Sequence, residues 1–122
     1  MMITKEYINM CEMAEEVQKE WEQSIGDVFI YKHDIKTGCY YYITEDRKYR
    51  HAIHLPTLEQ LFEMVINYKN RGYDIGGILL GIKIFTDENN LGGLHIKELI
   101  IRWVMHELYH KSWNGEKWEA IA

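Results

Sequence analysis

The chain has 122 residues, a formal net charge of −5 and an apolar fraction of 47%. This length predicts one globular domain over residues 1–122, and the apolar fraction excludes a disordered protein. The acidic balance argues against nucleic acid as a partner, because phosphate backbones are bound by basic surfaces. The opening MMITKEYINM lacks the basic start and apolar run of a signal peptide, and no later stretch is apolar enough to span a bilayer, so we expect a cytoplasmic protein with no membrane partner.

The first predicted element is an amphipathic helix over residues 5–23. Thr4 is suited to be its N-cap, and Gly26 lies where a residue of positive φ would follow the helix. Side chains that would face the core recur every three or four residues: Tyr7, Met10, Cys11, Ala14, Val17 and Trp21. Acidic residues fill the opposite side, which we interpret as a solvated surface.

From residue 28 the period of the apolar residues changes to two, which predicts strands. The first two strands, 28–33 and 39–45, are joined by a turn in which Asp34 and Gly38 supply the local hydrogen bond and the positive φ of a hairpin loop. A third strand over 49–55 completes a predicted β-meander, whose core face must be covered by other elements.

A second helix is predicted to begin at Leu58, because Thr57 as the N-cap and Gln60 fit a capping box. It would end at Gly72. The side chains expected in its buried stripe are Leu58, Leu61, Phe62, Val65 and Tyr68.

Residues 76–85, GGILLGIKIF, form a short run rich in branched apolar side chains and flanked by glycines, which predicts a buried strand. A phosphate-binding loop is the weaker interpretation, because the glycines precede the apolar run and nucleotide loops follow a strand. The polar loop 86–94 could ligate calcium, but it lacks the spacing of a calcium-binding loop and is better interpreted as a turn.

The last predicted helix, 95–111, is the most apolar element, and Trp113-Asn114-Gly115 then signals a tight turn that leads to a small C-terminal hook. The order of the elements indicates the α+β class. We expect a single domain in which three helices pack on a small, mostly antiparallel sheet with a β-meander and the C-terminal hook.

Residues 106–110 read HELYH and fit the zinc-protease pattern H-E-x-x-H. On a helix, His106 and His110 would point the same way and could share one ion, with Glu107 as the base that activates the bound water. A catalytic zinc needs a third protein ligand, however, and few ligand-type side chains follow His110. A zinc-dependent hydrolase is therefore the least favoured function.

The helical wheel also weighs against zinc. Glu98 and Arg102 fall on the same stripe as His106, where they would form an ordinary surface pair and the cation would oppose a divalent ion. We therefore place His106 on a solvated face and His110 at the margin of the core. No metal and no cofactor are expected.

Four colinear stretches share a further pattern: KEYINMCEMAEEVQKEW, IHLPTLEQLFEMV, LIIRWVMHELYHKSW and WNGEKWEA. Together they resemble a family of small uncharacterised phage and prophage proteins of Gram-positive bacteria. The family pattern reads E-Y-I-x-M-C-x-x-A-E-E, then L-P-x-x-x-Q-L-x-x-M, then W-x-x-F-V-M-x-E-x-Y-x-K-x-W-[ND]-G-E-x-W. It covers roughly half of the chain and is more specific than a five-residue motif.

The resemblance implies a setting and no mechanism. Within the pattern Glu107 is required and the two histidine positions are free, which argues against zinc independently of geometry. The segment YKHDIKTGCYYYITEDRKYR has no counterpart in the pattern, so a function of that hairpin would not be shared with the family.

Our leading hypothesis is a phage accessory protein that acts without catalysis by binding a host protein, in anti-defence or host takeover. Exposed tyrosine and tryptophan are enriched at protein interfaces. The candidate binding residues are Tyr40, Tyr41, Tyr42, Trp113 and Trp118. Three consecutive tyrosines on a strand must alternate between its faces, so at least one should be exposed. The alternative is a binder of a small molecule or signalling nucleotide, with aromatic rings for stacking and a cation for phosphate from Arg47, Lys48, Arg50 or Arg71.

Overall fold

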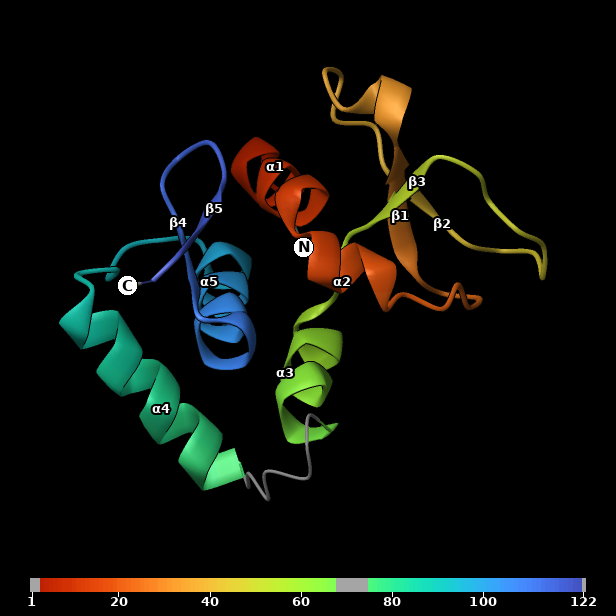
Figure 1. The fold of residues 1–122 in the computed structure, drawn as a ribbon. Helices are drawn as coiled ribbons and strands as arrows, with labels where there is room; N and C mark the ends of the chain where they lie inside the picture. Colours follow the sequence, from red (N-terminus) through yellow and green to blue (C-terminus); the bar gives the residue numbers. More distant parts are fainter. Residues whose placement is uncertain (1–2, 68–74, 122) are drawn as a thin grey trace. The chain divides into compact units, whose positions relative to one another are not determined.

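A computed structural model describes residues 3–67 and 75–121 (Figure 1). The chain divides into two compact units, Met1–Thr57 (unit 1) and Leu58–Ala122 (unit 2), and each is described by itself. The described residues form five α-helices and two small antiparallel sheets. The mixed α and β class is confirmed, whereas the predicted count of three helices is wrong. The single domain over 1–122 stays a prediction.

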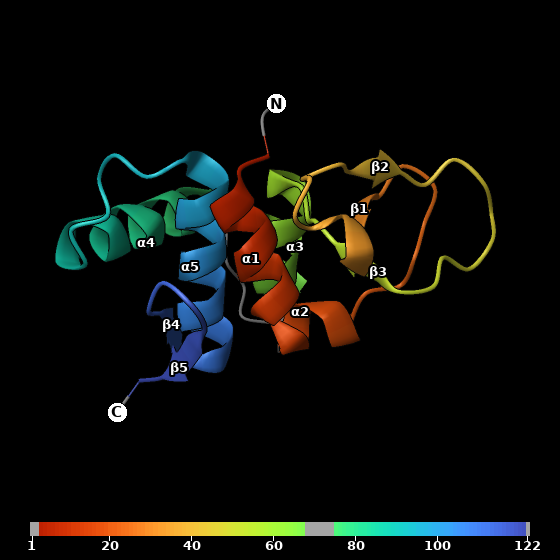
Figure 2. The same ribbon diagram turned by 90° about the horizontal axis from the view of Figure 1, so that it is seen from above.

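In unit 1 the predicted helix 5–23 is broken into α1, Lys5–Met13, and α2, Glu15–Lys19, a change of direction that is visible in Figure 2. Thr4 is the N-cap of α1, as predicted, and its hydroxyl accepts a hydrogen bond from the Tyr7 N–H at 3.1 Å. The break is at the buried Ala14, whose backbone has left the helical region with φ −84° and ψ 77°. Its physical reason is a side-chain bond from Gln18, described below.

The sheet of unit 1 has three short strands: β1, Val28–Tyr31; β2, Tyr41–Tyr42; and β3, Ala52–His54. Their order is β2-β1-β3 with both pairs antiparallel, so β1 is central. The predicted β-meander is therefore wrong, because β3 pairs with β1 and not with β2. The strands are also shorter than predicted, since a 3-10 turn, η1 (Lys32–Asp34), follows β1 directly.

One face of this sheet carries an aromatic core. Phe29, Ile43 and Tyr49 form its buried cluster, and Trp21 and Tyr31 pack against it. Phe29 and Tyr31 share a face of β1 because they are two residues apart. Tyr41 is the register partner of Phe29 across the sheet, which places a third ring beside them.

Two glutamine side chains fasten the irregular parts of unit 1. The Gln18 amide accepts a hydrogen bond from the His54 N–H at 2.8 Å and donates to the His54 carbonyl at 3.0 Å, so it pairs with β3 as a neighbouring strand would. It also donates to the Cys11 carbonyl at 2.9 Å, beside the helix break. Gln23 bonds both the N–H and the carbonyl of Tyr49 in the same way, each at 2.8 Å. These bonds take the place of longer helices and strands.

Unit 2 contains α3, Leu58–Asn67; α4, Ile75–Glu88; and α5, Ile96–Tyr109. Helix α5 contacts both α3 and α4, and its inward residues supply the core of the unit. They are Ile100, Ile101, Trp103, Val104, Met105 and Leu108. No helix in the described ranges is long and apolar enough to cross a membrane.

Helix α4 replaces the strand that was predicted over 76–85. Its inward positions Ile78, Ile82 and Phe85 follow the helical spacing of three and four, and the Gly81 backbone lies beside the Trp103 indole, where an added Cβ would be 3.7 Å from the ring. A short branched run fits a buried strand and a packed helix equally well, so the sequence pattern could not separate them. Because α4 extends to Glu88, the loop expected at 86–94 begins three residues later than predicted.

The start of α3 at Leu58 agrees with the prediction, while Tyr68, Arg71 and Gly72 lie outside the described residues. The C-terminal hook is confirmed as a hairpin of β4, Lys111–Trp113, and β5, Trp118–Ala120, in which the two tryptophans are register partners. Its turn is held by the Asn114 side chain, which accepts hydrogen bonds from two backbone N–H groups.

The Gln18→Ala substitution should lower the free energy of unfolding by about 2–4 kcal/mol, because it removes three hydrogen bonds from a half-buried amide. Urea denaturation followed by circular dichroism measures the change. Glu22→Ala, at an exposed position of the same segment, should change stability by less than about 0.5 kcal/mol. Equal midpoints for the two variants would show that the Gln18 bonds do not hold unit 1 together.

Candidate functional site

The surface of unit 1 has a hollow of about 420 Å³ over the aromatic face of the sheet, which we call the aromatic hollow. Five phenylalanine and tyrosine rings line it: Phe29, Tyr31, Tyr41, Tyr42 and Tyr49. Four ionisable side chains do so as well: His33, Asp34, Glu45 and Arg47. Aromatic and charged groups therefore surround the same hollow.

The rings are packed on one another and on the sheet. Phe29 is buried at the base, and its centroid lies 5.0 Å from both Tyr31 and Tyr49 and 5.8 Å from Tyr41. Tyr31 meets Phe29 edge to face, which is a favoured arrangement of aromatic pairs. The Gln23 amide fixes the backbone of Tyr49, so this ring is positioned although no strand contains it.

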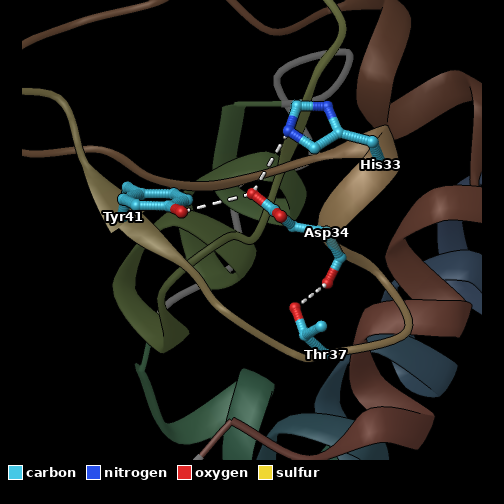
Figure 3. Close-up of polar contacts among 4 residues, drawn as sticks. All are labelled: His33, Asp34, Thr37 and Tyr41. Atoms are coloured by element: carbon cyan, nitrogen blue, oxygen red, sulfur yellow. Dashed lines mark hydrogen bonds and ion pairs between the residues drawn. The ribbon is translucent and has the colours of Figure 1, made fainter.

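At one end of the hollow the Asp34 carboxylate bridges two aromatic side chains (Figure 3). The Tyr41 hydroxyl donates to its Oδ2 at 3.2 Å, and His33 Nε2 lies 3.6 Å from the same atom. The His33 ring is stacked on Tyr31, with centroids 5.4 Å apart and planes 9° from parallel. The Thr37 hydroxyl donates to the Asp34 carbonyl at 2.9 Å and closes the turn that carries this carboxylate.

This arrangement changes the acidity of Tyr41. The negative charge of Asp34 raises the pKa of the Tyr41 phenol, and the hydrogen bond to the same carboxylate adds to the effect. The phenol therefore stays protonated, and keeps donating to Asp34, over a wider range of pH than an isolated tyrosine would.

Arg47 also lines the hollow: its guanidinium carbon lies 4.0 Å from the centroid of the Tyr49 ring, and its side chain interacts with that of Tyr31 as well. Its Nε is 3.2 Å from a Glu45 carboxylate oxygen, and both side chains are largely exposed. The hollow thus holds a cation against an aromatic face with a carboxylate beside it, which is a known mode of guanidinium binding.

The three consecutive tyrosines of the predicted site all lie on this unit. Tyr40, Tyr41 and Tyr42 have exposed fractions of 36%, 42% and 60%, although alternation required only one to be exposed. The second and third border the aromatic hollow, and the rings of the first and third contact each other with centroids 6.5 Å apart. All three are accessible because β2 is an edge strand of two residues.

The two tryptophans of the predicted site belong to unit 2. The rings of Trp113 and Trp118 are 5.1 Å apart, but Trp113 is 7% exposed and so acts mainly in packing. Trp113 borders a second hollow, of about 350 Å³, together with Arg102 and His106. The structure therefore gives the predicted tyrosines and the predicted tryptophans separate surroundings.

The HELYH segment does not form one helical face. Helix α5 ends at Tyr109, and His110 adopts the left-handed conformation with φ 51° and ψ 49°, so the helical geometry that would align His106 with His110 is interrupted. His106 is half-buried with its ring 5.0 Å from that of Phe85, and Glu98 is buried, so the solvated stripe predicted for them is wrong. Among the described residues, no three or more His, Cys, Asp or Glu side chains lie close enough to hold a metal ion. Glu107, the candidate base for a zinc-bound water, therefore has no cluster of metal ligands beside it among these residues.

Several residues of the hollow were not predicted as site residues. Phe29, Tyr31 and Tyr49 were counted only as parts of strands, and Gln23 as part of a helix. The alternation of Phe29 and Tyr31 with the later tyrosines was a usable signal, because it puts rings on one face of a hairpin. Nothing in the local sequence pointed to the bond between Gln23 and Tyr49.

No protein-family model matches the chain, and neither a curated protein nor a solved structure matches it. The resemblance to the phage and prophage proteins therefore stays a prediction. The chemistry of the site rests on the residues of this chain alone.

The His110→Gly substitution should raise the free energy of unfolding by about 0.5–1 kcal/mol, because glycine adopts the left-handed conformation without the steric cost of a side chain. The same substitution one turn earlier, His106→Gly, should destabilise by about 1 kcal/mol or more, since that residue is inside the helix. Thermal and urea unfolding measure both. Destabilisation by both substitutions would indicate that the helix continues through HELYH.

The Asp34→Asn substitution should lower the pKa of the Tyr41 phenol toward its usual value, because it removes the charge that opposes phenolate formation. In the native chain the Tyr41 hydrogen bond persists below the raised pKa and is lost as pH rises through it. A pH titration of the ¹³C-labelled Tyr41 ring by NMR measures the shift. Thr37→Ala is the control, since Thr37 bonds the Asp34 carbonyl and not its carboxylate, and an equal shift there would exclude a specific effect of the charge.

Proposed function

We propose that this chain is a non-enzymatic binding module whose aromatic hollow and neighbouring tyrosines contact a protein partner. One observation carries the proposal: two of the three exposed consecutive tyrosines, Tyr40–Tyr42, line a hollow that also holds three other aromatic rings and an arginine. Tyrosine and arginine are enriched where partners bind and among the residues that contribute most to affinity.

The form of the hollow also supports a macromolecular partner. It is open, and the exposed tyrosines extend its aromatic surface along β2, so a partner could contact the base and the edge together. The edge strand leaves backbone groups of β2 on its outer side, which is a common place for another chain to bind.

The setting we propose follows from the resemblance in the sequence. A phage or prophage accessory protein of a Gram-positive host would act on a host factor in the cytoplasm, in anti-defence or host takeover. The tyrosine-rich hairpin lies in the part of the chain that the family pattern does not cover, so the identity of the partner would be specific to this chain.

A small ligand with a planar ring and a negative charge is the second candidate. It is favoured by one specific observation, the Arg47 guanidinium at the edge of the aromatic hollow, and the cavity volume is within the range of small-molecule sites. A nucleotide panel tests it by thermal shift, because a ligand at 100 times its dissociation constant adds about 2.7 kcal/mol of stability.

The binding proposal is tested by replacing the exposed rings. Immobilised native chain should retain a protein from the lysate of a Gram-positive host, and the purified partner should bind the Tyr41→Ala, Tyr42→Ala double variant about 30-fold more weakly, as for a binding hot spot. Biolayer interferometry measures the affinities.

The matched control is the Leu79→Ala, Leu80→Ala double variant, which removes two side chains that are each 60% exposed on unit 2. It should bind the partner with native affinity. Retention of no protein at micromolar concentrations, or equal affinity of the tyrosine variant and the native chain, would contradict the proposal.

A further inference from the structure

The aromatic hollow already contains one bound guanidinium, that of its own Arg47. The group lies 4.0 Å over the Tyr49 ring, and Glu45 accepts its Nε–H at 3.2 Å. The pair demonstrates which chemistry the walls of the hollow accommodate: the π face of a tyrosine and a carboxylate that together hold a planar cation.

The surroundings of Asp34 repeat these parts, a carboxylate beside tyrosine rings, and the Arg47 side chain also reaches Tyr31. Asp34 supplies the carboxylate, and the rings of Tyr31 and Tyr41, whose centroids are 5.6 Å apart, supply aromatic surface beside it. The ion-pair partner that the structure gives Asp34 is His33, at 3.6 Å, which is charged only when protonated.

The electrostatics of the hollow favour a cation. Its lining has two carboxylates, Asp34 and Glu45, against one guanidinium, which leaves a formal charge of −1 with His33 neutral. The negative faces of the five phenylalanine and tyrosine rings add to this field, and Arg47 is already compensated by Glu45. An anionic ligand would meet a field of the wrong sign everywhere except beside Arg47.

We propose that the Asp34 end of the aromatic hollow binds an arginine side chain of the protein partner. The inference rests on the proposed function and names the group that the site recognises. Asp34 accepts hydrogen bonds from the guanidinium, and the exposed Tyr41 ring provides the face against which it stacks. Arginine fits better than lysine, because a planar, weakly hydrated guanidinium can stack and bond at once.

Each neighbour of Asp34 has a distinct role in this site. The Tyr41 hydroxyl binds Oδ2 and orients the carboxylate, while the Thr37 hydroxyl holds the backbone of the turn. Arg47 lies in the same hollow as a like charge, so it weakens the binding of a second cation. Removal of the Asp34 charge should weaken a cationic ligand and strengthen an anionic one, and removal of the Arg47 charge should do the reverse.

The test is an NMR titration of the full chain with N-acetyl-L-arginine amide, followed on the rings of Tyr31 and Tyr41. The expected dissociation constant is on the order of 1–10 mM for one side chain. Asp34→Asn should weaken binding about tenfold, since it removes the charged acceptor. Arg47→Gln should strengthen it roughly two- to threefold, because it removes a screened like charge.

Two further probes fix the chemistry. N-acetyl-L-citrulline amide has the shape of the arginine probe without its charge and should bind too weakly to saturate, and the lysine analogue should bind more weakly than arginine. Inorganic phosphate tests the anion alternative. Saturable phosphate binding that Arg47→Gln abolishes and Asp34→Asn strengthens would overturn the proposal, as would the absence of saturable arginine binding at 50-fold over the expected constant.

The failure of this inference can be told from the failure of the proposed function. If the captured partner is lost with the Tyr41→Ala, Tyr42→Ala variant but binds Asp34→Asn with native affinity, the hollow binds a protein by another group and the arginine inference is wrong. If Asp34→Asn weakens the partner about tenfold and replacement of one partner arginine by lysine does the same, the inference holds. The Glu22→Ala variant, at an exposed position of unit 1 that does not line the hollow, should bind the partner as the native chain does.

Discussion

The pairing of the Gln18 amide with the backbone of His54 is the constraint on which unit 1 depends. The amide donates and accepts along the outer edge of β3, so it seals an edge strand that would otherwise offer both groups to another chain. Its second donated bond goes to the Cys11 carbonyl at the break between α1 and α2, which also accepts from the Ala14 N–H. The helix change and the sheet edge are therefore stabilised by the same side chain.

Further contacts follow from this placement. His54 is held under Trp21, with the two rings parallel and 4.6 Å apart, and the Trp21 indole N–H donates to Asp27 at 2.9 Å. Asp27 also accepts from the Ser24 N–H at 3.0 Å, which orders the connection into β1. Gln23, in the same connection, holds Tyr49 at the wall of the aromatic hollow. The site is thus built on irregular backbone that side-chain amides and a carboxylate make definite.

The sequence predicted those elements whose causes are local. The Thr4 cap, the start of α3 at Leu58 and the hairpin between Trp113 and Trp118 each depend on residues within four or five positions of one another. The break at Ala14 was not predictable in this way, because it depends on bonds of Gln18 that reach 36 residues along the chain. Helix α4 was not predicted for a different reason: an apolar run of ten residues fits the period of a strand and that of a helix equally well.

The candidate site divides along the same line. The alternation of side chains along a strand predicted that at least one of Tyr40–Tyr42 is exposed, and in the structure all three are. The pattern underestimated their exposure because it could not show that β2 is an edge strand of two residues. The end of α5 at His110 was hidden because a left-handed histidine replaces the glycine that usually marks a helix end. The grouping of Tyr31, Tyr49 and Asp34 required the register of the sheet, which propensities do not supply.

The division between fixed backbone and exposed rings has a consequence for binding. A tyrosine has few rotatable bonds, so little conformational entropy is lost when its ring is covered, and the bond from Tyr41 to Asp34 reduces that loss further. The backbone under Tyr49 is already held by two hydrogen bonds to Gln23. Exposed aromatic surface on such a support is prepared for contact before a partner arrives, so binding does not require the hairpin to fold first. The Arg47 and Glu45 side chains are the largely exposed part of the hollow, so adaptation to a partner is expected there and not at its base.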